Sequence, residues 1–140
     1  DWDATMNVNL RGNFIITKAV LPLMMQEGWG RIIHVSSRGG VAGDIGTVSY
    51  SASKSALMGM SAVLAKEYAK FNITSNVLVL GTFDTGMFNK LPDRQKNKIL
   101  DKIPSKKYGS ISDVFNAINF IIKSDYVTSS VINVDGGIGE

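Results

Sequence analysis

The residues with the clearest chemical potential are Tyr50 and Lys54, which stand four positions apart in the chain. Residues at this spacing share one face of a helix, so the phenol and the ammonium would be neighbours in a helical segment. A tyrosine that acts as an acid or base near neutral pH needs its pKa brought down from about 10 to about 7, which corresponds to about 4 kcal/mol. An ammonium at about 4.5 Å, with an effective dielectric constant of about 20, supplies about 3.7 kcal/mol. The pair therefore predicts proton-transfer chemistry that needs no metal.

Two more polar residues make the pattern specific. With 4 tyrosines in the chain, about 0.3 Tyr–Lys pairs of this spacing are expected by chance, so the pair alone is a weak motif. Ser37 precedes Tyr50 by 13 positions, and Asn9 precedes Ser37 by 28. Including both lowers the chance expectation to about 0.002. We therefore treat Asn9, Ser37, Tyr50 and Lys54 as one candidate catalytic set.

The elements that must position this set alternate along the chain. Apolar spacing, glycine positions and β-branched runs predict helices and strands in strict succession. The expected helices are Asp3 to about Met25, Ser49 to about Lys70, a weak one over Arg94 to Ile103, and Ile111 to Lys123; the expected strands are Arg31–Val35, Ile73–Leu80 and Val131–Val134. This order is typical of an α/β fold with a Rossmann-like, doubly wound parallel sheet.

The helix near Ser49 to Lys70 has one charge, Lys54, between Ser49 and Ala65. A helix that is apolar on nearly every face is expected to be buried on more than one side, here with help from another subunit. The strand Arg31–Val35 would be an apolar sheet edge, and such edges are normally covered by a neighbouring strand. Both features predict that residues 1–140, taken as a single domain fragment, belong to a larger assembly.

The candidate set resembles the catalytic tetrad of the classical short-chain dehydrogenases/reductases. The resemblance runs in register along essentially the whole chain, and places it as the C-terminal half of that Rossmann domain, closest in type to the 3-oxoacyl-thioester reductases. The stretches that carry it are Val8-Asn9-Leu10, Gly30-Arg31-Ile32-Ile33, Val35-Ser36-Ser37, Tyr50 to Lys54, Ile73-Thr74-Ser75-Asn76-Val77 and Val134-Asp135-Gly136-Gly137.

The resemblance implies a role for each residue of the set. Tyr50 would be the general acid or base, and Ser37 would hydrogen-bond the same substrate oxygen. Lys54 would hold the ribose hydroxyls of NAD or NADP and lower the tyrosine pKa, while Asn9 would relay protons from Lys54 to solvent through a water. The cofactor itself carries the hydride.

The resemblance also implies contacts to the nicotinamide from the loop after the second predicted strand. By matching position these are Gly81, Phe83 and Thr85, next to Tyr50 and Lys54 as cofactor-binding residues. The chain departs from the family pattern at Leu80, where proline is usual, and at Ser129, where glycine is common. The glycine-rich phosphate loop would lie before Asp1, in an N-terminal half that we expect as a partner.

The composition argues against several other classes of function. The net charge of +3 is too small and dispersed for a nucleic-acid binder. With no cysteine and one histidine, no metal site is expected. The first residues lack the pattern of a signal peptide and no long apolar run is present, so a cytoplasmic protein with no membrane contact is the expectation.

One charged segment invites two interpretations. Residues 89–107 contain seven lysine or arginine residues and two aspartates. They could form a solvated lid. They could instead attract an anionic substrate, such as a 3-oxoacyl thioester, or an acidic acyl-carrier protein.

The leading hypothesis is an NAD(P)-dependent oxidoreductase that interconverts an alcohol and a ketone on a small carbonyl substrate, as a homo-oligomer (dimer or tetramer). One alternative is a nucleotide-sugar epimerase or dehydratase that uses the same Tyr–Lys pair. Another is a non-catalytic, truncated fragment that retains the oligomerisation helices, and that would be inactive without its N-terminal part.

Overall fold

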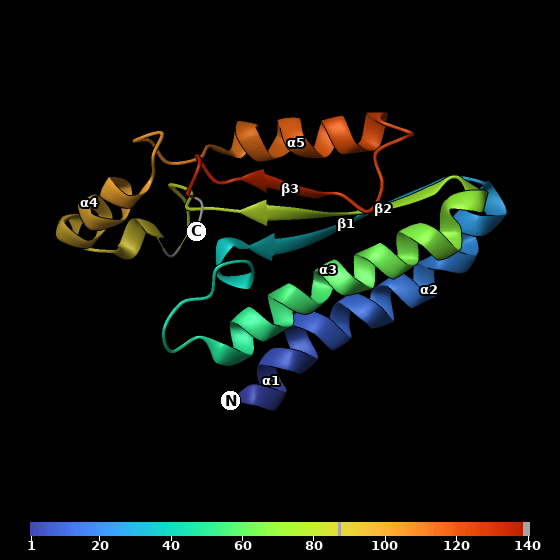
Figure 1. Cartoon of the computed structure of the whole chain (residues 1–140), viewed down its shortest axis with the longest axis horizontal. Helices are drawn as coiled ribbons and strands as arrows, with labels where there is room; N and C mark the ends of the chain where they lie inside the picture. Colours follow the sequence, from blue (N-terminus) through green and yellow to red (C-terminus); the bar gives the residue numbers. More distant parts are fainter. Residues whose placement is uncertain (87, 139–140) are drawn as a thin grey trace.

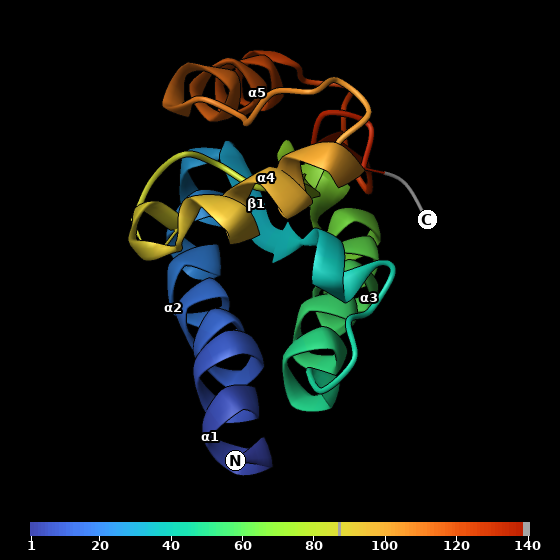
Figure 2. The ribbon, with the colours of Figure 1, turned by 90° about the vertical axis from the view of Figure 1, so that its left-hand side faces the viewer.

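A computed structural model describes residues 1–86 and 88–138 as three parallel strands between two layers of helices. The elements in chain order are α1 (Trp2–Met6), η1 (Asn7–Arg11), α2 (Gly12–Glu27), β1 (Gly30–Ser37), η2 (Arg38–Gly40), α3 (Val48–Tyr68), η3 (Ala69–Phe71), β2 (Ile73–Leu80), η4 (Phe88–Lys90), α4 (Asp93–Lys102), α5 (Ile111–Lys123) and β3 (Val131–Val134). Helices α2 and α3 cover one face of the sheet and α5 the other (Figures 1 and 2). The predicted α/β fold with a doubly wound parallel sheet is confirmed.

The sheet order is β1-β2-β3, with both pairings parallel. The central strand β2 is buried over nearly its whole length, because strands pair with it on both sides and helices cover both faces. Its Val77, Leu78 and Val79 are each at most 1% exposed. Strand β1 pairs only with β2 among the described residues, so it is the sheet edge that the sequence predicts. On that edge strand Val35 is 45% exposed.

The first predicted helix is continuous in the structure but contains one π-helical turn. Residues Asn7–Arg11 form a π-helical turn between α1 and α2, and Asn9 lies at its centre. Such turns are rare and occur often at functional sites. The helix ends at Gly28, which adopts a left-handed conformation (φ 61°) and whose N–H donates to the carbonyls of Met24 and Met25.

Helix α3 buries one stripe rather than several faces. Its buried residues are Ser53, Leu57, Ser61 and Ala65, which repeat every four positions. Among the described residues the sheet and the segments η1 and η2 pack against α3, and burial of a second side of this helix by another subunit stays a prediction. The apolar Val63 is 54% exposed. None of the helices in the described ranges has the length and apolar character required to cross a membrane.

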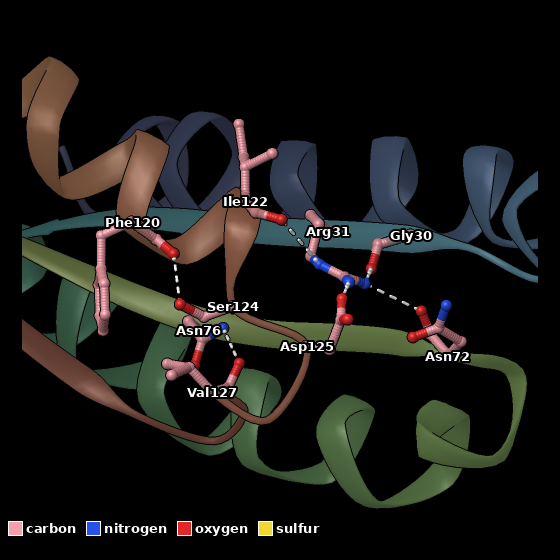
Figure 3. Close-up of polar contacts among 9 residues, drawn as sticks. All are labelled: Gly30, Arg31, Asn72, Asn76, Phe120, Ile122, Ser124, Asp125 and Val127. Atoms are coloured by element: carbon pink, nitrogen blue, oxygen red, sulfur yellow. Dashed lines mark hydrogen bonds and ion pairs between the residues drawn. The ribbon is translucent and has the colours of Figure 1, made fainter.

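A buried arginine ties the start of the sheet to the connection between α5 and β3 (Figure 3). The Arg31 guanidinium donates to the carbonyls of Gly30 (2.8 Å), Asn72 (3.0 Å) and Ile122 (3.3 Å), and forms an ion pair with Asp125. Because these contacts come from three separate segments, Arg31 holds the amino ends of β1 and β2 against α5.

Asn76 fixes the same connection further along β2 (Figure 3). Its Nδ2 donates to the Val127 carbonyl at 2.9 Å. Its Oδ1 accepts from the Ser130 amide at 3.1 Å. The amide therefore sets where β3 begins to pair with β2.

Candidate active site

The carboxyl ends of β1 and β2 lie side by side and form the floor of the candidate site. Ser37, the last residue of β1, is in register with Leu80, the last residue of β2, and Gly81 follows directly. Helix α4 lies beyond these strand ends, and α3 begins near them (Figure 1). In open parallel sheets, ligands bind outside the carboxyl ends of the strands.

Ser37 and Tyr50 both lie against the backbone of Gly39. The Ser37 Oγ accepts a hydrogen bond from the Gly39 amide at 3.3 Å. A Cβ placed on Gly39 would lie 3.4 Å from Cε1 of Tyr50, so the ring packs on that glycine. Tyr50 is 38% exposed, so its phenol remains open to a ligand. The structure thus brings two of the predicted catalytic residues to one short turn.

Lys54 reaches back from α3 to the end of β1. Its Nζ donates to the Val35 carbonyl at 3.0 Å and lies 5.9 Å from the centre of the Tyr50 ring. A Cβ on Gly40 would come within 2.6 Å of Lys54 Cβ, so the glycine lets the turn pack on the lysine stem. An ammonium has three donors, and one is used here, so two remain for a ligand or water.

Asn9 contacts the start of α3 through Ser53. The Asn9 Nδ2 donates to Ser53 Oγ at 3.1 Å, and that hydroxyl donates to the Tyr50 carbonyl at 2.7 Å. The Asn9 carbonyl accepts from Asn13 Nδ2 at 2.7 Å. Asn9 therefore supports the turn of helix that carries Tyr50, and a water-mediated link to Lys54 stays a prediction.

A cavity of about 320 Å³ opens beside Ser37. It is lined by Ser37 and Gly81 from the strand ends, and by Ile99 and Lys102 from α4. The Arg38 guanidinium, also at this cavity, pairs with the Asp44 carboxylate at 2.8 Å. Its described lining thus combines a hydroxyl, apolar side chains, two cations and the Asp44 carboxylate, and does not include Tyr50 or Lys54.

The predicted cofactor-binding residues in the loop after β2 do not all lie at the same cavity. Gly81 lines the cavity beside Ser37, whereas Thr85 lines a different cavity, of about 640 Å³, with Tyr108 and Ser110. The Phe83 ring packs on Gly109, where an added Cβ would lie 2.4 Å from Cε1 of the ring. Roles for Phe83 and Thr85 at a nicotinamide stay predictions.

Sequence reasoning missed Ser53, Gly39 and Gly40. Ser53 is fully buried in a helix of small residues, and its position three residues after Tyr50 was the available signal. The two glycines follow β1 after Arg38, but their role depends on packing against Tyr50 and Lys54, which lie ten or more residues further on.

Comparison with known proteins identifies the family of this chain. A family model described as short chain dehydrogenase matches residues 1–96. The chain therefore belongs to the short-chain dehydrogenase family, as the resemblance in the sequence indicated.

Two of its relatives carry the same enzyme name. The chain is 41% identical over 140 residues to the 3-oxoacyl-[acyl-carrier-protein] reductase FabG of Thermotoga maritima, and 39% identical to that of Rickettsia felis. It is also 38% identical to nodulation protein G of a Rhizobium species. These matches cover 99% of this chain but 57%, 58% and 57% of the relatives. The chain thus spans little more than half of their length.

The family cofactor is NAD or NADP, and the residues at the strand ends fit its nicotinamide end. Lys54 has two N–H donors left beside the exposed phenol of Tyr50, on the side of the sheet where dinucleotides bind. The 140 residues contain no Gly-x-Gly-x-x-Gly loop to hold a pyrophosphate.

Proposed function

We propose that this chain carries the catalytic centre of an NAD(P)-dependent oxidoreductase that interconverts an alcohol and a ketone. The observation that supports this most directly is that Ser37, Tyr50 and Lys54 all contact the Gly39-Gly40 turn, with the Lys54 ammonium 5.9 Å from the centre of the Tyr50 ring. Hydroxyl, phenol and ammonium together can polarise a carbonyl, protonate it and hold a cofactor hydroxyl. Membership of the short-chain dehydrogenase family supports the same activity.

In the reducing direction, the Tyr50 phenol donates its proton to the carbonyl oxygen of the substrate. The Ser37 hydroxyl donates a hydrogen bond to the same oxygen, and so stabilises the charge that develops there. The bound cofactor supplies the hydride that the carbonyl carbon accepts. Lys54 holds the ribose hydroxyls and keeps a positive charge near the phenol, while Asn9 positions the Tyr50 turn through Ser53. In the oxidising direction each transfer is reversed.

We further propose that the substrate is a 3-oxoacyl thioester and that residues 1–140 form the second half of a larger Rossmann domain. The names of two relatives support the substrate class. The unpaired edge of β1 supports a neighbouring strand from the other half. A cytoplasmic location stays a prediction.

A homodimer or tetramer would be built on α2 and α3. These helices expose apolar side chains, among them Phe14, Ile15 and Val63, each more than half exposed. Between them lies a largely apolar groove of about 410 Å³ lined by Phe14, Leu21 and Met60. A second copy that packs here would cover side chains that are unfavourable in water.

The direct test is turnover by the intact protein that contains this chain. Purified protein with NADPH or NADH and a 3-oxoacyl thioester should lose the near-ultraviolet absorbance of the reduced cofactor and yield the 3-hydroxy product. Chiral chromatography of the product should show one enantiomer, because the oxygen is held from one side by Ser37 and Tyr50. Absence of cofactor oxidation across a panel of ketones and thioesters would contradict the proposed activity.

A further inference from the structure

Tyr108 holds helix α4 by a hydrogen bond from outside the helix. Its hydroxyl donates to the carbonyl of Lys96, in the middle of α4, at 2.8 Å. The Tyr108 ring packs on Phe88, which precedes α4, with 4.7 Å between the ring centres. The Lys96 ammonium lies 5.8 Å from the centre of the Phe88 ring. We call Phe88, Lys96 and Tyr108 the α4 clamp.

The segment that carries Tyr108 is fixed to the end of the sheet. The amide of Gly109 donates to the carbonyl of Thr82 at 3.0 Å, just beyond the carboxyl end of β2. The Phe83 ring packs on Gly109, and Phe83 and Gly109 also form a parallel β-bridge. The α4 clamp is therefore attached to the central strand of the sheet.

Helix α4 depends on such contacts because its own side chains bury little surface. It lies at one end of the molecule, beyond the strand ends (Figure 1), and none of its ten described residues is buried. Its carboxyl end is anchored, since Ile103 directly after it is 1% exposed and Lys106 Nζ donates to the Asp101 carbonyl at 2.6 Å. Nearer the amino end, the α4 clamp sets the direction in which the helix extends from that anchor.

The direction of α4 affects the candidate active site. Ile99, three residues after Lys96, lines the cavity of about 320 Å³ beside Ser37. A helix that turned about its anchored carboxyl end would carry Ile99 away from this cavity. A residue that prevents such a movement contributes to substrate binding without touching the substrate, because small displacements of a binding wall are costly.

Resting on the proposed function, we propose that Tyr108 is a positioning residue for the substrate. Its hydroxyl holds α4 in the place where Ile99 closes the cavity beside Ser37. Tyr108 also lines the second cavity, of about 640 Å³, together with Thr85. Because the hydroxyl proton is used in the bond to Lys96, its effect falls on α4 and not on a cofactor at that second cavity.

Tyr108→Phe in the intact protein removes the hydroxyl and keeps the ring against Phe88. The KM for a 3-oxoacyl thioester of a short neutral thiol should rise by about threefold to tenfold, as expected for the loss of one partly buried hydrogen bond. The kcat and the KM for NADPH or NADH should be nearly unchanged. A rise in the cofactor KM in place of the thioester KM would overturn the assignment to the substrate.

Tyr126→Phe is the matched control for this measurement. It removes the hydroxyl of a tyrosine that is fully exposed in the connection between α5 and β3. This variant should leave kcat and both KM values unaffected. An equal rise in the thioester KM for both variants would contradict the role of Tyr108.

A double variant tests whether Tyr108 acts through Ile99. Ile99→Ala alone should raise the thioester KM, because it removes part of the cavity wall. Combined with Tyr108→Phe, the rise should be smaller than the product of the two separate rises, since both substitutions disturb the same wall. Fully independent effects would mean that Tyr108 does not act through α4.

Hydrogen exchange measured without cofactor or substrate separates this inference from the proposed activity. The backbone amides of α4 should exchange faster in Tyr108→Phe than in the unchanged protein, while those of α5 should not. If this difference appears but the unchanged protein reduces no ketone or thioester, the positioning of α4 stands and the enzymatic proposal fails. If the protein reduces thioesters and Tyr108→Phe changes neither the exchange of α4 nor the KM, the positioning proposal is wrong and the activity stands.

Discussion

At the residue scale, Lys54 is held near Tyr50 by its helical spacing and by a contact with β1. Their four-residue separation places both on the first part of α3, but the ammonium donates its hydrogen bond to the Val35 carbonyl of β1. The strand carbonyl therefore holds Lys54 in place before any ligand binds. Such a preorganised charge costs no rearrangement when the reaction begins.

Tyr50→Phe should lower kcat by about 10²–10⁴-fold, because the ring stays and the proton is lost. Thermal unfolding should be nearly unchanged, since the phenol is partly exposed. Tyr126→Phe is the matched control, because it removes a hydroxyl from a tyrosine that is fully exposed. Near-normal turnover by Tyr50→Phe would remove this residue from the mechanism.

His34 should make stability depend on pH in the mildly acidic range. It is 2% exposed, its Nε2 has no hydrogen-bond partner among the described residues, and burial lowers its pKa below 6.5. The folded state therefore keeps the imidazole neutral, while the unfolded state binds a proton once the pH falls below about 6.5. Because the unfolded state then binds more protons, stability should fall as the pH falls through this range.

The measurement is the melting temperature between about pH 7.5 and pH 5.5 for the unchanged protein and for His34→Leu, which cannot titrate. The melting temperature of His34→Leu should fall less on acidification than that of the unchanged protein. Identical pH profiles would mean that His34 contributes nothing to the dependence.

At the scale of elements, the hydrogen bonds from Arg31 to backbone carbonyls stabilise the amino ends of β1 and β2 more than its ion pair with Asp125 does. The Arg31 side chain is 2% exposed, but that of Asp125 is 82% exposed, so solvent weakens their attraction. The three carbonyl contacts are the larger contribution, because they satisfy backbone groups at the start of the sheet.

Arg31→Met should therefore lower the free energy of unfolding by about 2–4 kcal/mol. Asp125→Asn should lower it by about 1 kcal/mol or less. Urea unfolding followed by circular dichroism measures both. A larger loss for Asp125→Asn than for Arg31→Met would contradict this ranking.

At the scale of the whole molecule, the exposed apolar faces of α2 and α3 predict association. The intact protein should scatter light as a dimer or tetramer. Val63→Glu should shift it toward monomer at low concentration, because a carboxylate would be buried in the interface. Ile111→Glu is the control, since that exposed isoleucine lies on α5, across the sheet. A monomeric unchanged protein would contradict the prediction.

The sequence alone determined the elements and the candidate set, because both depend on local spacing. The strands Ile73–Leu80 and Val131–Val134 and the helix Ile111–Lys123 agree with the structure in both bounds, since apolar periodicity, glycines and a capping serine mark their ends. The four polar residues were found by their intervals, and the family comparison agrees with that resemblance.

Only the tertiary structure decided which groups touch. Asn9 meets Ser53 across 44 residues, and Gly40 packs on the stem of Lys54, because helices α1 to α3 fold back on one face of the sheet. The same packing leaves Thr85 at a separate cavity from Ser37. Contacts of this kind depend on how segments far apart in the sequence pack against each other. The spacing of residues along the chain does not report that packing.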